Sequence, residues 1–102
     1  MRIVKEKFLR DAAEHYPKAG KYLAAWRATV RAAAWRNMAD VRGCYGSADM
    51  VRVRSGKPVI VFNVCGNTYR LIVAMHFNSQ MAYTLGFLTH TEYNRNDWKD
   101  EL

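Results

Sequence analysis

Two apolar runs decide the fold of this chain: Pro58-Val59-Ile60-Val61-Phe62-Asn63-Val64 and, after Cys65-Gly66-Asn67-Thr68, Tyr69-Arg70-Leu71-Ile72-Val73-Ala74-Met75-His76-Phe77. The first run is rich in β-branched residues, which favour strands, and it is almost entirely apolar. We therefore predict a central strand that is buried on both faces of its sheet. The glycine and asparagine between the runs are typical of a turn, so the second run is predicted to be the next strand.

One further strand is predicted on each side of this pair. Residues 50–54 alternate valines with Arg52 and Arg54, which indicates a half-exposed strand with its arginines on one side. Residues 81–88 return as the fourth strand after a turn. The strands are predicted to form an antiparallel meander.

The N-terminal third of the chain has the spacing of two helices. Residues 5–16 carry apolar side chains at helical spacing until Pro17 ends the pattern. Residues 18–35 carry an apolar stripe at intervals of four, four and three residues, as a buried helical face requires. With a short strand at residues 1–4, the order is β-α-α followed by the meander, which is an α+β fold. A chain of this length is expected to form a single domain over residues 1–102.

The remaining segments are expected to be short or poorly ordered. Residues 37–47 are mixed in character, with Gly43 and Gly46 as predicted breakers. A short C-terminal helix or tight turn is predicted to open at Thr89. The polar tail, residues 94–102, is expected to be frayed.

The net charge of +7 is concentrated in the middle of the chain. Residues 18–57 carry nine basic and two acidic side chains, whereas the charges of the two ends cancel. Such an asymmetry attracts a polyanion, although a solvated face or an acidic protein partner also accounts for it. The apolar runs are too short to span a membrane and the N-terminus lacks a signal sequence, so a cytoplasmic protein without membrane contact is expected.

No cofactor or metal site is predicted. The histidines lack the spacing of zinc ligands, the acidic residues do not cluster, and there is no phosphate-binding loop or nucleophile elbow. Cys44 and Cys65 are expected to be small, buried or half-buried thiols. His15 is expected to cap a helix and His76 to be a core residue.

Arg70 is the first candidate for a functional residue. It lies in a strand whose other residues are almost all apolar, where a guanidinium is costly unless it reaches solvent or an anion. Its forked geometry suits a phosphate. An ion pair with Glu92 or Asp49 is the alternative explanation.

Three further candidates follow the last predicted strand. His90 lies where side chains tend to project into a cleft, and histidine is the usual side chain for proton transfer near neutral pH. Glu92 is either a general base or, in the pattern Thr89-x-x-Glu92, the second half of a capping box. Tyr93 is expected either to stack on a base or to anchor the last helix.

Together these four residues indicate metal-free cleavage of RNA. The 2′-hydroxyl would be the nucleophile, and a cation would stabilise the charge that develops on the phosphate. The basic residues of the half-exposed strand and its turn are the candidates for RNA binding: Arg52, Arg54 and Lys57.

The chain resembles the HigB-type toxins of bacterial type II toxin–antitoxin modules in two motifs, Gly66-Asn67-x-Tyr69-Arg70-Leu71 and Thr89-His90-x-Glu92-Tyr93. The order of elements, Trp35 at the end of the second helix, and Ser47-Ala48-Asp49 before the sheet are similar as well. The resemblance implies a RelE-like fold, in which two helices pack on an antiparallel sheet.

The resemblance also implies an activity and its partners. Such a protein would be an mRNA interferase that acts in the translating ribosome. A cognate HigA-type antitoxin with a helix-turn-helix domain would neutralise it, and an antitoxin dimer would give a heterotetramer. By position, Arg70 would hold the scissile phosphate and His90 would act as an acid or base. Glu92 and Tyr93 would support the site or stack within it. Tyr69 would pack beside it, at the RNA-binding surface.

Two features depart from the family pattern and leave the acid–base pair open. Asn94 stands where related chains commonly have aspartate, and the lysine-rich catalytic surface of RelE has no clear match. Since a shared fold does not determine function, a non-catalytic protein is the second hypothesis. It would be a relative of the gyrase-poisoning toxins of this superfold, or a basic RNA- or ribosome-binding module. A degenerate toxin retained as an antitoxin-bound repressor is the third.

Overall fold

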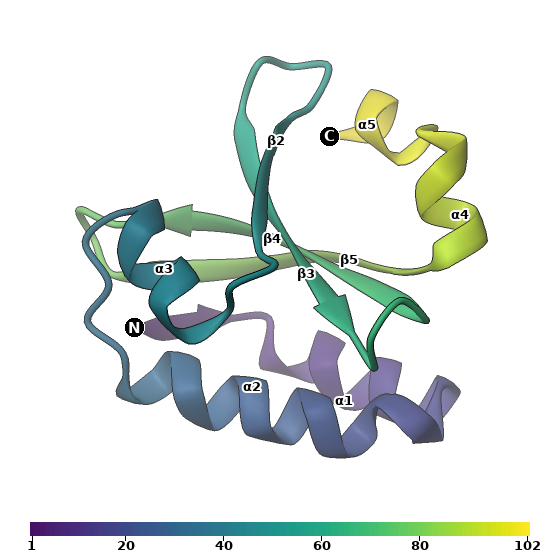
Figure 1. Cartoon of the computed structure of the whole chain (residues 1–102), viewed down its shortest axis with the longest axis horizontal. Helices are drawn as coiled ribbons and strands as arrows, with labels where there is room; N and C mark the ends of the chain where they lie inside the picture. The colour runs from purple at the N-terminus through teal and green to yellow at the C-terminus, as the bar shows by residue number, and fades with distance from the viewer.

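A five-stranded sheet runs through the centre of the computed structural model, which describes all 102 residues of the chain (Figure 1). Its strands are β1 (Arg2–Val4), β2 (Asp49–Arg52), β3 (Pro58–Val64), β4 (Tyr69–His76) and β5 (Met81–Thr89). Their order across the sheet is β1-β5-β4-β3-β2. Strands β2 to β5 pair antiparallel, which confirms the predicted meander, and β1 adds a parallel edge strand beside β5.

Helices lie on both faces of this sheet. They are α1 (Glu6–His15), α2 (Gly20–Ala32), α3 (Met38–Cys44), α4 (His90–Arg95) and α5 (Trp98–Glu101), with a 3-10 turn, η1 (Pro17–Ala19), between the first two. The long helices α1 and α2 cover one face, whereas α4 and α5 follow the end of β5 on the opposite side (Figure 1). This arrangement confirms the predicted α+β, RelE-like fold. None of the helices has the length and hydrophobicity that spanning a bilayer requires.

The central strand β3 is buried on both faces, as predicted. Phe62 packs against α2, where the Trp26 ring meets it edge-on at 5.5 Å. Val59 and Val61 face the other way and form a second, smaller core with Trp98 of α5. Because side chains alternate along a strand, the sheet separates the helical core from the surface that α4 and α5 cover.

Two predicted boundaries near the middle of the chain were wrong. Helix α2 ends at Ala32 rather than at Trp35, which is buried in the core from the following loop. The segment expected to be irregular contains α3, which continues through Gly43. The side chain of Asn37 caps this helix by accepting a hydrogen bond from the Asp40 amide at 3.0 Å, and that bond offsets the weak helical preference of the glycine.

The prediction of a frayed C-terminal tail was also wrong. The tail folds into α5 because Trp98 supplies an aromatic anchor and is only 8% exposed. Its ring stacks on Tyr93 at 5.3 Å, and its Nε1 donates to the Tyr93 carbonyl at 3.1 Å. The Lys99 carbonyl accepts a hydrogen bond from the amide of Arg54, which ties α5 to the turn after β2.

Candidate active site

Arg70 occupies the start of β4, on the face of the sheet opposite α1 and α2. It pairs with Asn63 of β3 and Leu88 of β5, and it is only 7% exposed. The turn before it includes Gly66, whose φ of 68° lies in the left-handed region that favours glycine. This turn brings Asn67 back over the start of β4.

The Arg70 guanidinium has only neutral hydrogen-bond partners. Its Nη2 donates to Asn67 Oδ1 at 2.7 Å and lies 3.3 Å from Nδ1 of His90. Its Nη1 donates to the carbonyl of Tyr69 at 3.1 Å. The guanidinium carbon also lies 5.3 Å from the centre of the Tyr93 ring, within the range of a cation–π contact.

No carboxylate neutralises Arg70. The expected alternative, an ion pair with Glu92 or Asp49, is wrong. Asp49 instead faces Arg42 at 3.7 Å, and a Glu92 oxygen accepts from the Thr89 amide. Burying a cation without a counter-ion is costly. Arg70 therefore leaves an unneutralised positive charge at one end of β4, and such a site suits an anion.

The structure brings His90 directly to Arg70. His90 is the first residue of α4, and its amide donates to the Thr68 carbonyl at 3.0 Å, which fixes the start of the helix against the turn between β3 and β4. Its Nδ1 faces the guanidinium, and its Nε2 lies 3.0 Å from the side-chain amide of Asn94, one helical turn further on. The imidazole is therefore held at both nitrogens.

Glu92 forms a capping box, which is one of the two roles predicted for it from the sequence. The Thr89 amide donates to Glu92 Oε1 at 2.9 Å, and the Glu92 amide donates to Thr89 Oγ1 at 3.2 Å. The hydrogen bond from the Thr89 amide is the main reason that the pKa of this carboxyl lies below its usual range, and Arg95 and His15 lower it further. An ionised carboxylate whose oxygen is occupied by a cap is a weak general base.

Glu92→Gln is therefore expected to leave cleavage activity unchanged, because glutamine completes a capping box equally well. The lowered pKa adds stability that is present above the pKa of the unfolded carboxyl and is lost as pH falls through the folded pKa. The melting temperatures of the wild type and the variant should thus converge as pH falls. A loss of cleavage of about 100-fold in a folded variant would show instead that the carboxylate is a general base.

The Tyr93 ring packs between Arg70 and Trp98. It lies under the Arg70 guanidinium and stacks on Trp98, so it couples the candidate site to α5. Burial raises the pKa of its hydroxyl, and the nearby Asp49 adds to this effect, while Arg70 partly opposes it. The phenol therefore stays protonated near neutral pH, and its ring is the part that contacts the site.

Two of the residues expected at the RNA-binding surface lie on the helical face instead. Tyr69 is 8% exposed and packs against Tyr16 and Phe87, with ring centres 4.9 and 5.2 Å away. Arg52 alternates with Val51, whose side chain packs in the second core, so Arg52 points to the helical side of the sheet edge. The expectation that both residues line one cleft with Arg70 is not supported, because each faces away from it.

Arg54 and Lys57 lie towards the far end of the sheet from Arg70. They belong to the turn before Pro58, whereas Arg70 pairs with Asn63, five residues and about 17 Å further along β3. Lys57 lines a separate pocket of about 600 Å³ between this end of the sheet and α5. These residues add positive charge to the molecule but do not form a wall around Arg70.

Two contact residues of the site escaped the assignment from sequence. Asn67 belongs to the motif around Arg70 but has no predicted role, and Asn94 stands out in the sequence only as a departure from the family pattern. The spacing from His90 to Asn94, four residues on a short helix, is the signal that indicates a contact. The asparagine that precedes Arg70 by three residues in a turn offers no comparable signal.

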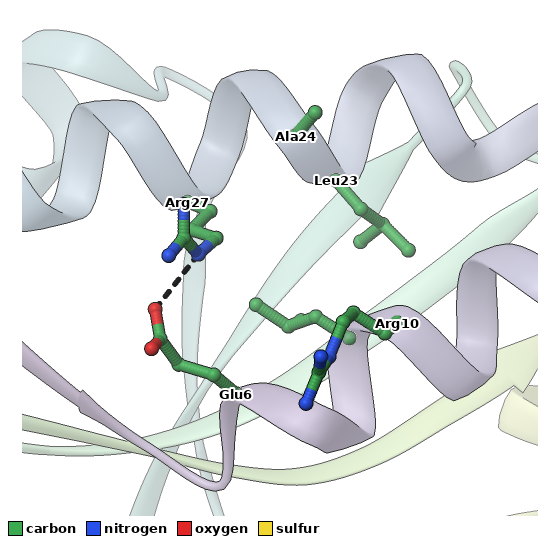
Figure 2. Close-up of a pocket in the computed structure, with 6 residues that line it drawn as sticks. Glu6, Arg10, Leu23, Ala24 and Arg27 are labelled. Carbon is green, nitrogen blue, oxygen red and sulfur yellow. Dashed lines mark hydrogen bonds and ion pairs between the residues drawn. The ribbon is translucent and has the colours of Figure 1, made fainter.

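A groove between α1 and α2 lies on the other face of the molecule. Figure 2 shows its lining, in which Arg27 bonds Glu6 at 2.7 Å beside Arg10 and Leu23. The groove encloses about 390 Å³ and contains no histidine or tyrosine, so it is not the candidate active site. No three His, Cys, Asp or Glu side chains converge to hold a metal ion anywhere in the chain.

The sheet order, the helical pair on one face and the basic composition define a small RelE-like α+β protein. Residues 19–96 match the sequence model of the HigB toxin, the RelE-like toxic component of a toxin–antitoxin system. The chain is 31% identical over 94 residues to the mRNA interferase toxin HigB of Escherichia coli strain K12, an alignment that covers 92% of this chain and 88% of the relative. The same identity and coverage relate it to the mRNA interferase HigB of Shigella flexneri.

The chain therefore belongs to the HigB toxin family. This membership confirms the resemblance seen in the two motifs, and it implies an antitoxin as the partner of the chain.

Proposed function

We propose that this chain is an mRNA interferase, an endoribonuclease that cleaves mRNA in the translating ribosome and so inhibits translation. The single observation that carries the proposal is the buried, unneutralised guanidinium of Arg70 beside His90. The names of the E. coli and Shigella relatives, both mRNA interferases, support the same activity. A non-catalytic RNA-binding module would also use the guanidinium to bind a phosphate, but it would not need a proton acceptor beside it.

In the proposed reaction, Arg70 binds the scissile phosphate of the RNA. The phosphate oxygens would take over the guanidinium hydrogen bonds that now go to neutral acceptors such as Asn67. The guanidinium then stabilises the charge that develops on the phosphate as the reaction proceeds. Since the guanidinium is held in place by its hydrogen bonds and is only 7% exposed, this interaction is stronger than it would be in solution.

His90 would accept the proton of the 2′-hydroxyl next to that phosphate. As the 2′-oxygen forms its bond to phosphorus, the bond from phosphorus to the 5′-oxygen breaks, and the departing 5′-oxygen takes a proton from water. The imidazolium returns its proton to the hydroxide that this leaves. The products are a 2′,3′-cyclic phosphate and a free 5′-hydroxyl, and no further reactant is consumed.

We extend the proposal to the partners and the location. The antitoxin would be a HigA-type protein with a helix-turn-helix domain, and a dimer of it would give a heterotetramer. The net charge of +7 supports an encounter with ribosome-bound mRNA, because it draws the protein towards RNA. The action would take place in the cytoplasm, where mRNA is translated.

Expression of the chain without antitoxin tests the proposed function. We expect growth arrest together with discrete new 5′ ends inside translated reading frames, detected by primer extension on cellular mRNA. Stalled replication with intact mRNA would support the gyrase-poisoning alternative and refute the proposal. Unimpaired growth at a high level of folded protein would favour the degenerate toxin.

A further inference from the structure

The imidazole of His90 is the only histidine ring in the structure with a hydrogen-bonding side chain at each nitrogen. Arg70 Nη2 lies 3.3 Å from Nδ1, and the Asn94 carboxamide lies 3.0 Å from Nε2. The other ring contacts of histidines are with aromatic neighbours: Tyr16 for His15 and Tyr83 for His76. The pair of contacts at His90 decides which nitrogen carries the proton.

Arginine can only donate hydrogen bonds, so the Nδ1 that faces Arg70 must be the unprotonated nitrogen. A neutral His90 therefore carries its proton on Nε2, and that N–H points at the Asn94 side chain. The opposite tautomer would place an N–H of the ring against an N–H of the guanidinium. It would thus exchange a hydrogen bond for a repulsive contact.

Asn94 can complete this arrangement because a carboxamide has a donor on one side and an acceptor on the other. In the structure it is the amide nitrogen, Nδ2, that faces Nε2. A half-turn of the amide exchanges its nitrogen and oxygen, and the oxygen then accepts from Nε2–H. The amide is also neutral. A carboxylate at this position would place a negative charge near Arg70, where it would compete with a phosphate.

We propose that Asn94 is a positioning residue, which accepts from Nε2–H of His90 and so holds the basic Nδ1 towards Arg70. This inference rests on the proposed function and deepens it, because it assigns Nδ1 as the nitrogen that takes the 2′-hydroxyl proton once the phosphate has taken over the Arg70 hydrogen bond that Nδ1 accepts in the free protein. His90 would thus be a general base that a third group, the Asn94 carboxamide, orients. The helix holds the geometry, since Asn94 lies four residues after His90 and the Thr89 cap fixes the first turn.

The ¹⁵N resonances of the His90 ring, measured near and above neutral pH, test the assignment without any activity. We expect the wild type to show one neutral tautomer, with the proton on Nε2. Asn94→Ala should give a mixture of tautomers, whereas Asn94→Asp keeps an acceptor and should keep the proton on Nε2. Asn78→Ala, which changes an exposed asparagine without a side-chain hydrogen bond, is the matched control and should leave the signals unchanged.

Cleavage of ribosome-bound mRNA gives the second readout. Asn94→Ala should lower kcat about 10-fold or more with little change in KM, because it misplaces the base and leaves phosphate binding intact. Two results would overturn the role of Asn94. One is a wild type whose neutral His90 carries its proton on Nδ1. The other is an Asn94→Ala variant with the same tautomer and the same kcat as the wild type. The predicted tautomer in a wild type that cleaves no RNA would support the hydrogen-bond assignment and refute the proposed function.

Discussion

Replacing Arg70 with methionine is expected to abolish growth arrest and to lower the rate of cleavage by at least about 100-fold. The guanidinium is the only buried cationic side chain of the protein, and it has no carboxylate partner. Its removal would take away the charge that the phosphate binds as the transition state forms. Growth after induction, at matched protein levels, measures the effect in cells, and single-turnover cleavage measures it with purified protein.

The stability of the variant separates loss of activity from loss of fold. Because Arg70 has no counter-ion, its replacement leaves no unpaired carboxylate behind, and a methionine can fill the same space among apolar neighbours. We expect the melting temperature of Arg70→Met to equal or exceed that of the wild type. Arg70→Lys should also fold and should keep only part of the activity, since an ammonium lacks the forked geometry of a guanidinium. A folded Arg70→Met that remains fully toxic would refute the assignment.

Replacing His90 with glutamine is expected to lower cleavage by about 100- to 10,000-fold, the usual range for a general base. Among the side chains that contact Arg70, the imidazole is the one that can act as a general base. Glutamine occupies similar space and keeps polar contacts with its neighbours, so the fold should persist. Single-turnover rates measured under saturating protein isolate the chemical step.

His76→Gln is the matched control for this prediction. His76 lies at the other end of β4, where its ring meets Tyr83 at 5.0 Å on an exposed part of the strand. Its replacement is expected to leave cleavage unchanged. If the His76 variant lost activity and the His90 variant kept it, the site would have to be sought near the pocket that Lys57 lines.

The sheet and the pairing of Arg70 with His90 were predictable because local signals agree with the tertiary structure. The β-branched run of β3 has no polar face, so it had to lie in the middle of a sheet. The turn that contains Gly66 predicts that β4 runs back beside β3. Alternation along β4 predicts that Arg70 and Leu71 lie on opposite faces of the sheet. Residues at the ends of adjacent antiparallel strands then meet at the same edge.

The predictions that were wrong concern features that depend on contacts between distant segments of the chain. Alternation along β4 does place Tyr69 on the face opposite Arg70, but no local pattern shows which face α1 and α2 cover, and that decides the surroundings of Tyr69 and Arg52. The fold of the tail follows from one residue, Trp98, which finds a pocket made by β3 and α4. The sequence around Trp98 is polar, so it gives no sign that the tail is ordered. A four-residue helix has almost no stability of its own, and it forms only because Trp98 is buried.

One unneutralised arginine has the strongest role in the proposed mechanism, so the most direct test compares the wild type with Arg70→Met on a ribosome-bound mRNA. The new 5′ ends are mapped, and their chemistry is read from whether a kinase can phosphorylate them without prior dephosphorylation. We predict discrete ends with a free 5′-hydroxyl from the wild type and none from the folded variant. Ends that carry a 5′-phosphate, or the same ends from Arg70→Met at an undiminished rate, would contradict the account.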